Sequence, residues 1–130
     1  MATYFGTDIN ESATIVLPAN AAITGARGIA LAISGGKVVK PAAGANCVGI
    51  SIMETDDDIE AGQDIDIQIK DIGKWVAGGV ISVGDELATD ADGKAVAAKS
   101  GDFIIGTALS AATAAGAWIK FQMTKSGYKA

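Results

Sequence analysis

One pattern occurs twice in this chain, as GGKVVKPAAGANCVGI at 35–50 and as DGKAVAAKSGDFIIGT at 92–107. The residues that recur at one constant spacing are Gly36 and Gly93, Lys37 and Lys94, Val39 and Val96, Gly44 and Gly101, and Gly49 and Gly106. The Gly-Gly and Asp-Gly pairs that open the copies tolerate the positive φ that a tight hairpin turn requires. The pattern therefore predicts two copies of one β unit, each beginning with a hairpin.

Downstream of the repeat, each copy becomes an alternating segment: QDIDIQI at 63–69 and AWIKFQM at 117–123. Alternation with a period of two indicates a strand with one buried face and one face that is wet or touches a partner. We expect Ile65, Ile67 and Ile69 to point inward in the first copy, and Ile119, Phe121 and Met123 in the second. The second copy lacks the acidic insert at 56–58. Two such units predict an all-β fold, a compact small barrel or a sandwich.

The same spacing divides the chain into segments. We assign 1–22 to an N-terminal arm and first strand, 23–70 to the first β unit, 71–79 to a connecting strand and link, 80–123 to the second β unit and 124–130 to a C-terminal tail. Together they are expected to form one compact domain. An extended arm can add as a strand to the exposed sheet edge of a partner. Tyr4, Phe5 and Ile9 are the candidate anchors of such an arm.

Composition excludes most catalytic and metal chemistry. The chain of 130 residues has no His and one Cys, Cys47, so a disulfide within the chain, a serine triad, a Cys–His nucleophile and most zinc sites are ruled out. The net charge of −5 comes without a basic cluster, which argues against direct nucleic acid binding. The apolar stretch at 13–26 is too short and interrupted to cross a membrane, and the N-terminus does not resemble a secretory signal. We expect no cofactor and no enzymatic activity.

Two acidic motifs contain residue types that suit cation binding or acid–base chemistry. Asp56, Asp58 and Glu60 have the spacing of a calcium loop, but the glycine comes one residue late and the final glutamate is missing, so a solvated acidic loop is favoured. Asp64 and Asp66 share one strand face and would suit acid–base work, but nothing near them in sequence points to that role. An exposed polar face is the favoured interpretation.

The second alternating segment has an unusual outward face. Trp118 and Lys120 lie on it, opposite the face that carries Ile119 and Phe121. Aromatic side chains are enriched at the centres of protein interfaces, so Trp118 and Lys120 are candidate contacts with a partner. The open alternative for Trp118 is that a loop of the same molecule covers it.

Several of these motifs resemble those of a known family. The elements GDELATDADGKAV, GDFIIGTALSAA and AAGAWIKFQM are similar to those of tailed-bacteriophage capsid cement (head decoration) proteins, and GGKVVKPAAGANCVGISIME with AGQDIDIQI looks like a diverged copy. The resemblance covers roughly 23–123. It carries over no catalytic residues.

The resemblance implies a structural virion protein. Members of that family are mostly β, with a small β-clip-like barrel. They are made in the host cytoplasm and dock on the capsid exterior. They often form homotrimers that bridge neighbouring copies of the major capsid protein. The alternative that remains open is a small-molecule or carbohydrate-binding β module, which would need a concave pocket with a few convergent polar groups.

Overall fold

Strands provide the regular structure of residues 12–52 and 58–130, the parts of the chain that this computed structural model describes. In chain order they are β1 (Thr14–Pro18), β2 (Ala30–Ser34), β3 (Lys37–Val39), β4 (Gly49–Ser51), β5 (Asp64–Gln68), β6 (Ile72–Val76), β7 (Glu86–Thr89), β8 (Ala95–Ala97), β9 (Phe103–Ala108) and β10 (Trp118–Tyr128). Residues 12–52 and 58–130 contain no helix, and hence none with the length and hydropathy needed to cross a bilayer. The predicted all-β class is confirmed.

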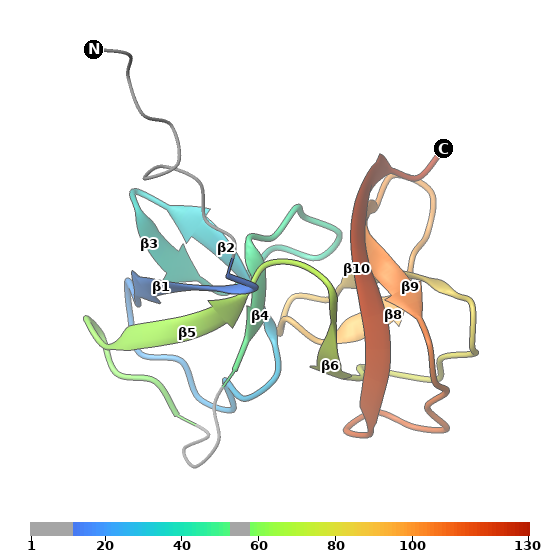
Figure 1. Ribbon diagram of the computed structural model, residues 1–130, viewed down its shortest axis with the longest axis horizontal. Helices are drawn as coiled ribbons and strands as arrows, with labels where there is room; N and C mark the ends of the chain where they lie inside the picture. The colour runs from blue at the N-terminus through green and yellow to red at the C-terminus, as the bar shows by residue number, and fades with distance from the viewer. Residues whose placement is uncertain (1–11, 53–57) are drawn as a thin grey trace.

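Each half of the chain forms one five-stranded antiparallel sheet. The strand orders are β1-β5-β4-β2-β3 and β6-β10-β9-β7-β8, so the second sheet repeats the connectivity of the first. Figure 1 shows the two sheets side by side, with a short link between β5 and β6. The predicted duplication of one β unit is therefore confirmed, in a sandwich-like arrangement of two packed sheets.

Both sheets curl toward closure. A parallel bridge joins Ala19, just after β1, to Val38 of β3, and these strands lie at opposite edges of the first sheet. The equivalent bridge in the second sheet joins Ala77, after β6, to Ala95 of β8. Because the same irregular contact recurs in both copies, the duplication extends beyond the residues that recur in sequence.

Two segments named from the sequence take part in the second sheet. β6 lies within 71–79, the expected connection, and it pairs with β10 in the position that β1 occupies beside β5. Residues 124–128, in the expected tail, belong to β10, which resumes its pairing with β9 beyond a bulge. There the Tyr128 ring packs edge-on against Phe103, with centroids 5.1 Å apart, and this contact holds the end of the strand on the sheet.

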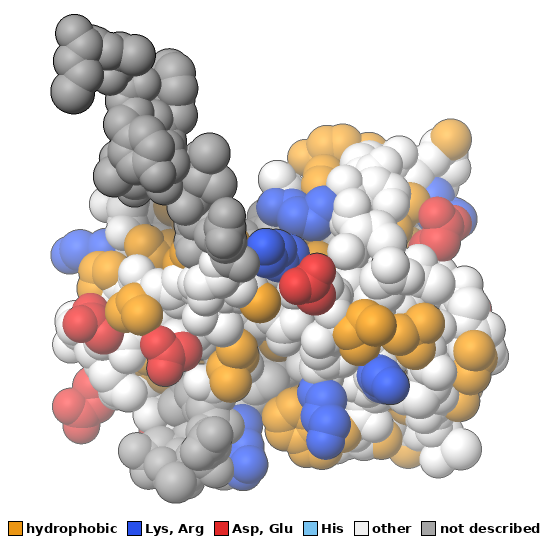
Figure 2. Space-filling model, viewed as in Figure 1, with side chains coloured by type: hydrophobic (Ala, Val, Ile, Leu, Met, Phe, Trp, Pro, Cys, Tyr) orange, Lys and Arg blue, Asp and Glu red, His pale blue; other side chains and the backbone are white. Residues whose placement is uncertain are grey.

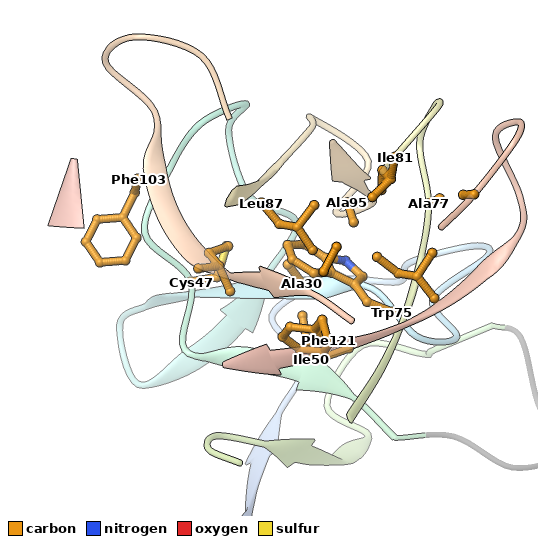
Figure 3. Packing of buried hydrophobic residues seen from close by; sticks show 14 residues of the cluster. Ala30, Cys47, Ile50, Trp75, Ala77, Ile81, Leu87, Ala95, Phe103 and Phe121 are labelled. Carbon is orange, nitrogen blue, oxygen red and sulfur yellow. The ribbon is translucent and has the colours of Figure 1, made fainter. Parts of the chain in front are cut away.

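The core has one cluster in each unit, and the second cluster extends into the first. Trp75 and Phe121 are fully buried at its centre, with ring centroids 5.2 Å apart. Ala30, Cys47 and Ile50 of the first unit join this cluster, and Figure 3 shows Ile50 next to Phe121. Of the inward positions predicted from alternation, Ile65, Ile67, Ile119 and Phe121 are confirmed as buried. The remaining two, Ile69 and Met123, are partly buried and pack against the two clusters.

The hairpin turn at Gly93 fastens the second unit to the first. Its carbonyl oxygen accepts hydrogen bonds from Ala30 N (2.7 Å) and from Trp75 Nε1 (2.8 Å). Gly93 has a φ of 80°, and a Cβ there would lie 2.9 Å from Ile29 Cβ. Only glycine satisfies both the turn and this close approach. The repeated Gly-Lys turn thus contributes to packing between the units.

Candidate docking surface

The outward face of the β6–β10 pair holds the candidate contact residues Trp118 and Lys120. In this register Trp118 lies opposite Val76, and Lys120 lies opposite Lys74. The side chains between them, Ile119 and Phe121, point into the core, so alternation along β10 turns Trp118 and Lys120 outward. The face therefore belongs to the most extensively paired strand of the second sheet.

Trp118 is partly covered within its own molecule. The ring rests on Gly28, where an added Cβ would collide with the ring atoms and lie 3.2 Å from Val76 Cγ2. Val76 N also donates a hydrogen bond to the Gly28 carbonyl oxygen at 3.0 Å, and Arg27 Cζ lies 5.9 Å from the Trp118 ring centroid. The side chain is still 47% exposed. A loop of the same molecule therefore covers one side of the indole and the rest of the ring is exposed, while contact of Trp118 with a partner stays a prediction.

Lys120 is fixed through its backbone, while its side chain is exposed. Its N–H donates to Ser110 Oγ at 2.8 Å, and its carbonyl oxygen accepts from Leu109 N at 2.8 Å. The residue opposite it, Lys74, is exposed too. Sequence reasoning missed Lys74 because the partner of β10 is set by long-range pairing, which no local pattern reveals. Two cations therefore lie side by side on an otherwise acidic protein.

The β1–β5 pair presents the equivalent face of the first sheet. Val16 lies opposite Asp66, and Pro18 lies opposite Asp64. Asp64 and Asp66 are exposed, whereas Ile65 and Ile67 between them are buried, as the alternation predicted. Because both carboxylates are exposed, their surroundings are those of a solvated face rather than of an acid–base pair.

Three of the candidate contacts, Tyr4, Phe5 and Ile9, lie outside the described residues, as does Asp56 of the calcium-like motif. Asp58 accepts a hydrogen bond from Gly25 N at 3.1 Å. Across 12–52 and 58–130, no grouping of three or more His, Cys, Asp or Glu residues could hold a metal ion. The described part of the acidic motif thus serves as a loop contact.

Cys47 is enclosed in the core. Burial raises the pKa of its thiol from the ordinary 9.0 to about 12, against a smaller lowering by Lys125. The thiolate is the nucleophilic form, and burial keeps its fraction negligible at neutral pH. Cys47 therefore packs as a small apolar side chain.

One depression opens beside the bridge that joins the edges of the first sheet. It is lined by Ala21, Ala22, Ile23, Val39 and Lys40 and has a volume of about 160 Å³. Sites for drug-sized ligands measure roughly 300–1,000 Å³ and gather several polar groups. The depression is smaller and mostly apolar, so it does not favour the ligand-binding alternative.

These features define the class of the protein: it is a duplicated β sandwich, and its candidate contacts Trp118 and Lys120 lie on an exposed strand face. The family model of phage cement proteins matches residues 8–123, and the chain belongs to this family. It is therefore a structural protein associated with a phage capsid. A search of curated proteins finds no match.

A solved structure supports the fold. The N base of the head fiber protein gp8.5 of bacteriophage phi29 is similar over 90% of this chain and 98% of that one. The TM-score is 0.70 at 20% sequence identity. At this identity the likeness shows a shared fold. The structural role rests on the family alone.

Proposed function

We propose that this protein binds the outer surface of an assembled phage shell as a homotrimer and bridges neighbouring copies of the major capsid protein. The observation that carries the proposal is family membership over residues 8–123. The exposed strand faces support it, since Trp118 and Lys120 offer the aromatic and charged groups typical of protein interfaces.

The N-terminal segment supplies the shell contact in this proposal. Tyr4, Phe5 and Ile9 anchor the arm, which adds to an exposed sheet edge of the major capsid protein through main-chain hydrogen bonds. In a trimer three arms bind one shell. Because the second and third contacts are intramolecular, the combined affinity exceeds that of one arm by orders of magnitude.

Co-sedimentation tests the proposal. Purified protein is mixed with assembled shells that lack it, and the pellet is assayed for bound protein and for the temperature at which shells release their DNA. We expect saturable, stoichiometric binding and a higher release temperature. Absence of binding, or binding with unchanged shell stability, would contradict the proposal.

A truncated variant tests the arm separately. Removal of residues 1–11 should leave the melting temperature of the β sandwich nearly unchanged but weaken co-sedimentation. The matched control is Y4A/F5A/I9A in the full-length chain, which keeps the backbone of the arm and removes its anchors. If both variants bind shells as tightly as the wild-type protein, another surface makes the contact.

A further inference from the structure

The equivalent faces of the two sheets carry opposite charges. Because β1 and β5 correspond to β6 and β10, their outward cross-strand pairs can be compared position by position. In the first sheet these pairs are Thr14–Gln68, Val16–Asp66 and Pro18–Asp64. In the second they are Ile72–Gln122, Lys74–Lys120 and Val76–Trp118. Where one copy has two carboxylates, the other has an indole and a pair of ammonium groups.

We call Val16, Asp64 and Asp66 the acidic face, and Lys74, Trp118 and Lys120 the basic face. Figure 2 shows acidic side chains among hydrophobic ones over the part that contains β1 and β5, and basic side chains among hydrophobic ones over the part that contains β6 and β10. The two faces therefore lie on equivalent strand pairs of the same molecule.

The charges of these faces are not neutralised by ion pairs inside the described chain. Between residues of 12–52 and 58–130 the ion pairs are Lys40–Asp92 and Lys129–Glu86, which lie on neither face. Like charges placed directly opposite each other on neighbouring strands destabilise a sheet. The Lys74–Lys120 pair thus breaks a local rule of sheet stability, and such breaks are expected at functional sites.

Each face combines its charges with an open apolar side chain. Val16 is 55% exposed beside Asp66, and Trp118 is 47% exposed one cross-strand pair away from Lys120. Stable interfaces pair a central aromatic or aliphatic contact with charges of opposite sign around it. The acidic face offers this arrangement with negative charge, and the basic face offers it with positive charge.

We propose that the acidic face of one copy docks on the basic face of a second copy. The carboxylates of Asp64 and Asp66 meet the ammonium groups of Lys74 and Lys120, and Val16 packs near Trp118. Charge complementarity selects this occupant, since the matching surface lies on equivalent strands of the same chain. The inference rests on the homotrimer of the proposed function and specifies which faces form its contacts.

Charge reversal tests the contact in solution. Sedimentation velocity over a wide concentration range measures self-association of the wild-type protein, K74E/K120E, D64K/D66K and the combined fourfold variant. We expect the wild type to associate, each twofold variant to associate at least about 100-fold more weakly because like charges then face each other, and the fourfold variant to recover to within about tenfold. Far-UV circular dichroism and melting curves establish that each variant is folded.

The matched control is K37E/K99E, which changes the net charge by the same amount as K74E/K120E at exposed lysines outside both faces. It should associate like the wild type. A wild-type protein that stays monomeric at every concentration overturns the inference, and so does a K74E/K120E variant that associates as tightly as K37E/K99E.

Shell co-sedimentation separates this inference from the proposed function. Shell binding by a wild-type protein that never self-associates overturns the inference and leaves attachment to the shell intact. Self-association that the twofold variants abolish, without shell binding by any variant, supports the inference and contradicts the attachment. If K74E/K120E loses shell binding while its self-association is unchanged, the basic face contacts the shell and the inference is wrong.

Discussion

The recurring glycines Gly49 and Gly106 provide a strong test of the duplicated fold. A Cβ added at Gly49 would lie 2.8 Å from Ile67 Cγ2 and 2.9 Å from the carbonyl carbon of Gln68. A Cβ at Gly106 would lie 2.8 Å from Phe121 Cδ2 and 3.1 Å from the carbonyl carbon of Gln122. In both sheets the obstacle includes the backbone of the neighbouring strand, which no rotamer change can relieve.

The expected cost follows from this geometry. Ordinary van der Waals contact begins at 3.4 Å, and the carbonyl oxygens of Gln68 and Gln122 lie closer to the added Cβ atoms than the carbons do, so the neighbouring strand must shift by roughly 1 Å or more at either site. Overpacking of a core costs about 1–3 kcal/mol, and the rigid backbone places G49A and G106A at the upper end, about 3 kcal/mol each. For a chain of this size, that lowers the melting temperature by about 10 °C.

Urea and thermal denaturation, followed by tryptophan fluorescence, measure both variants against G79A. Gly79 has no neighbour within 4 Å of an added Cβ and no positive φ, so G79A should lie within about 0.5 kcal/mol of the wild type or be slightly more stable. If G49A and G106A have the same denaturation midpoints as G79A, the close strand contacts at the recurring glycines are wrong.

Three further predictions concern single contacts. Because the folded-state pKa of Cys47 is raised, the free energy of unfolding should fall as the pH rises from 9.0 toward about 12, and C47A should remove this slope in urea titrations at stepped pH. W75F loses the hydrogen bond from the indole to the Gly93 carbonyl oxygen and leaves a small void, so the free energy of unfolding should fall by about 1–2 kcal/mol in the same denaturation assay. An unchanged midpoint would contradict this hydrogen bond. G28A combines a φ of 64° with a collision against the Trp118 ring, so a double-mutant cycle with W118A should recover part of its destabilisation but not the part due to φ; strict additivity would show that the ring does not rest on Gly28.

Much of the fold follows from local patterns in the sequence. Alternation in QDIDIQI and AWIKFQM sets which side chains face inward, because the period of a strand is fixed by its backbone geometry. The constant spacing from Gly36 to Gly49 and from Gly93 to Gly106 reveals the duplication, since both copies need the same turn and the same close strand contact. These features are encoded within short windows.

The remaining features depend on contacts between distant segments. β1 reads TIVLP and β6 reads IGKWV, so nothing in their sequences shows that they occupy equivalent places. The support of Trp118 by Gly28 and the opposition of Lys74 to Lys120 arise from sheet register, which the pairing of whole strands determines. For this reason Trp118 and Lys120 could be selected from the sequence, whereas Lys74 and Arg27 could not.

Electron cryomicroscopy of shells with and without the protein measures the central claim most directly. We expect added density on the outer surface, at positions where neighbouring major capsid proteins meet, into which the two five-stranded sheets fit as a trimer. Identical maps for the two samples, despite saturating protein, would contradict attachment to the shell.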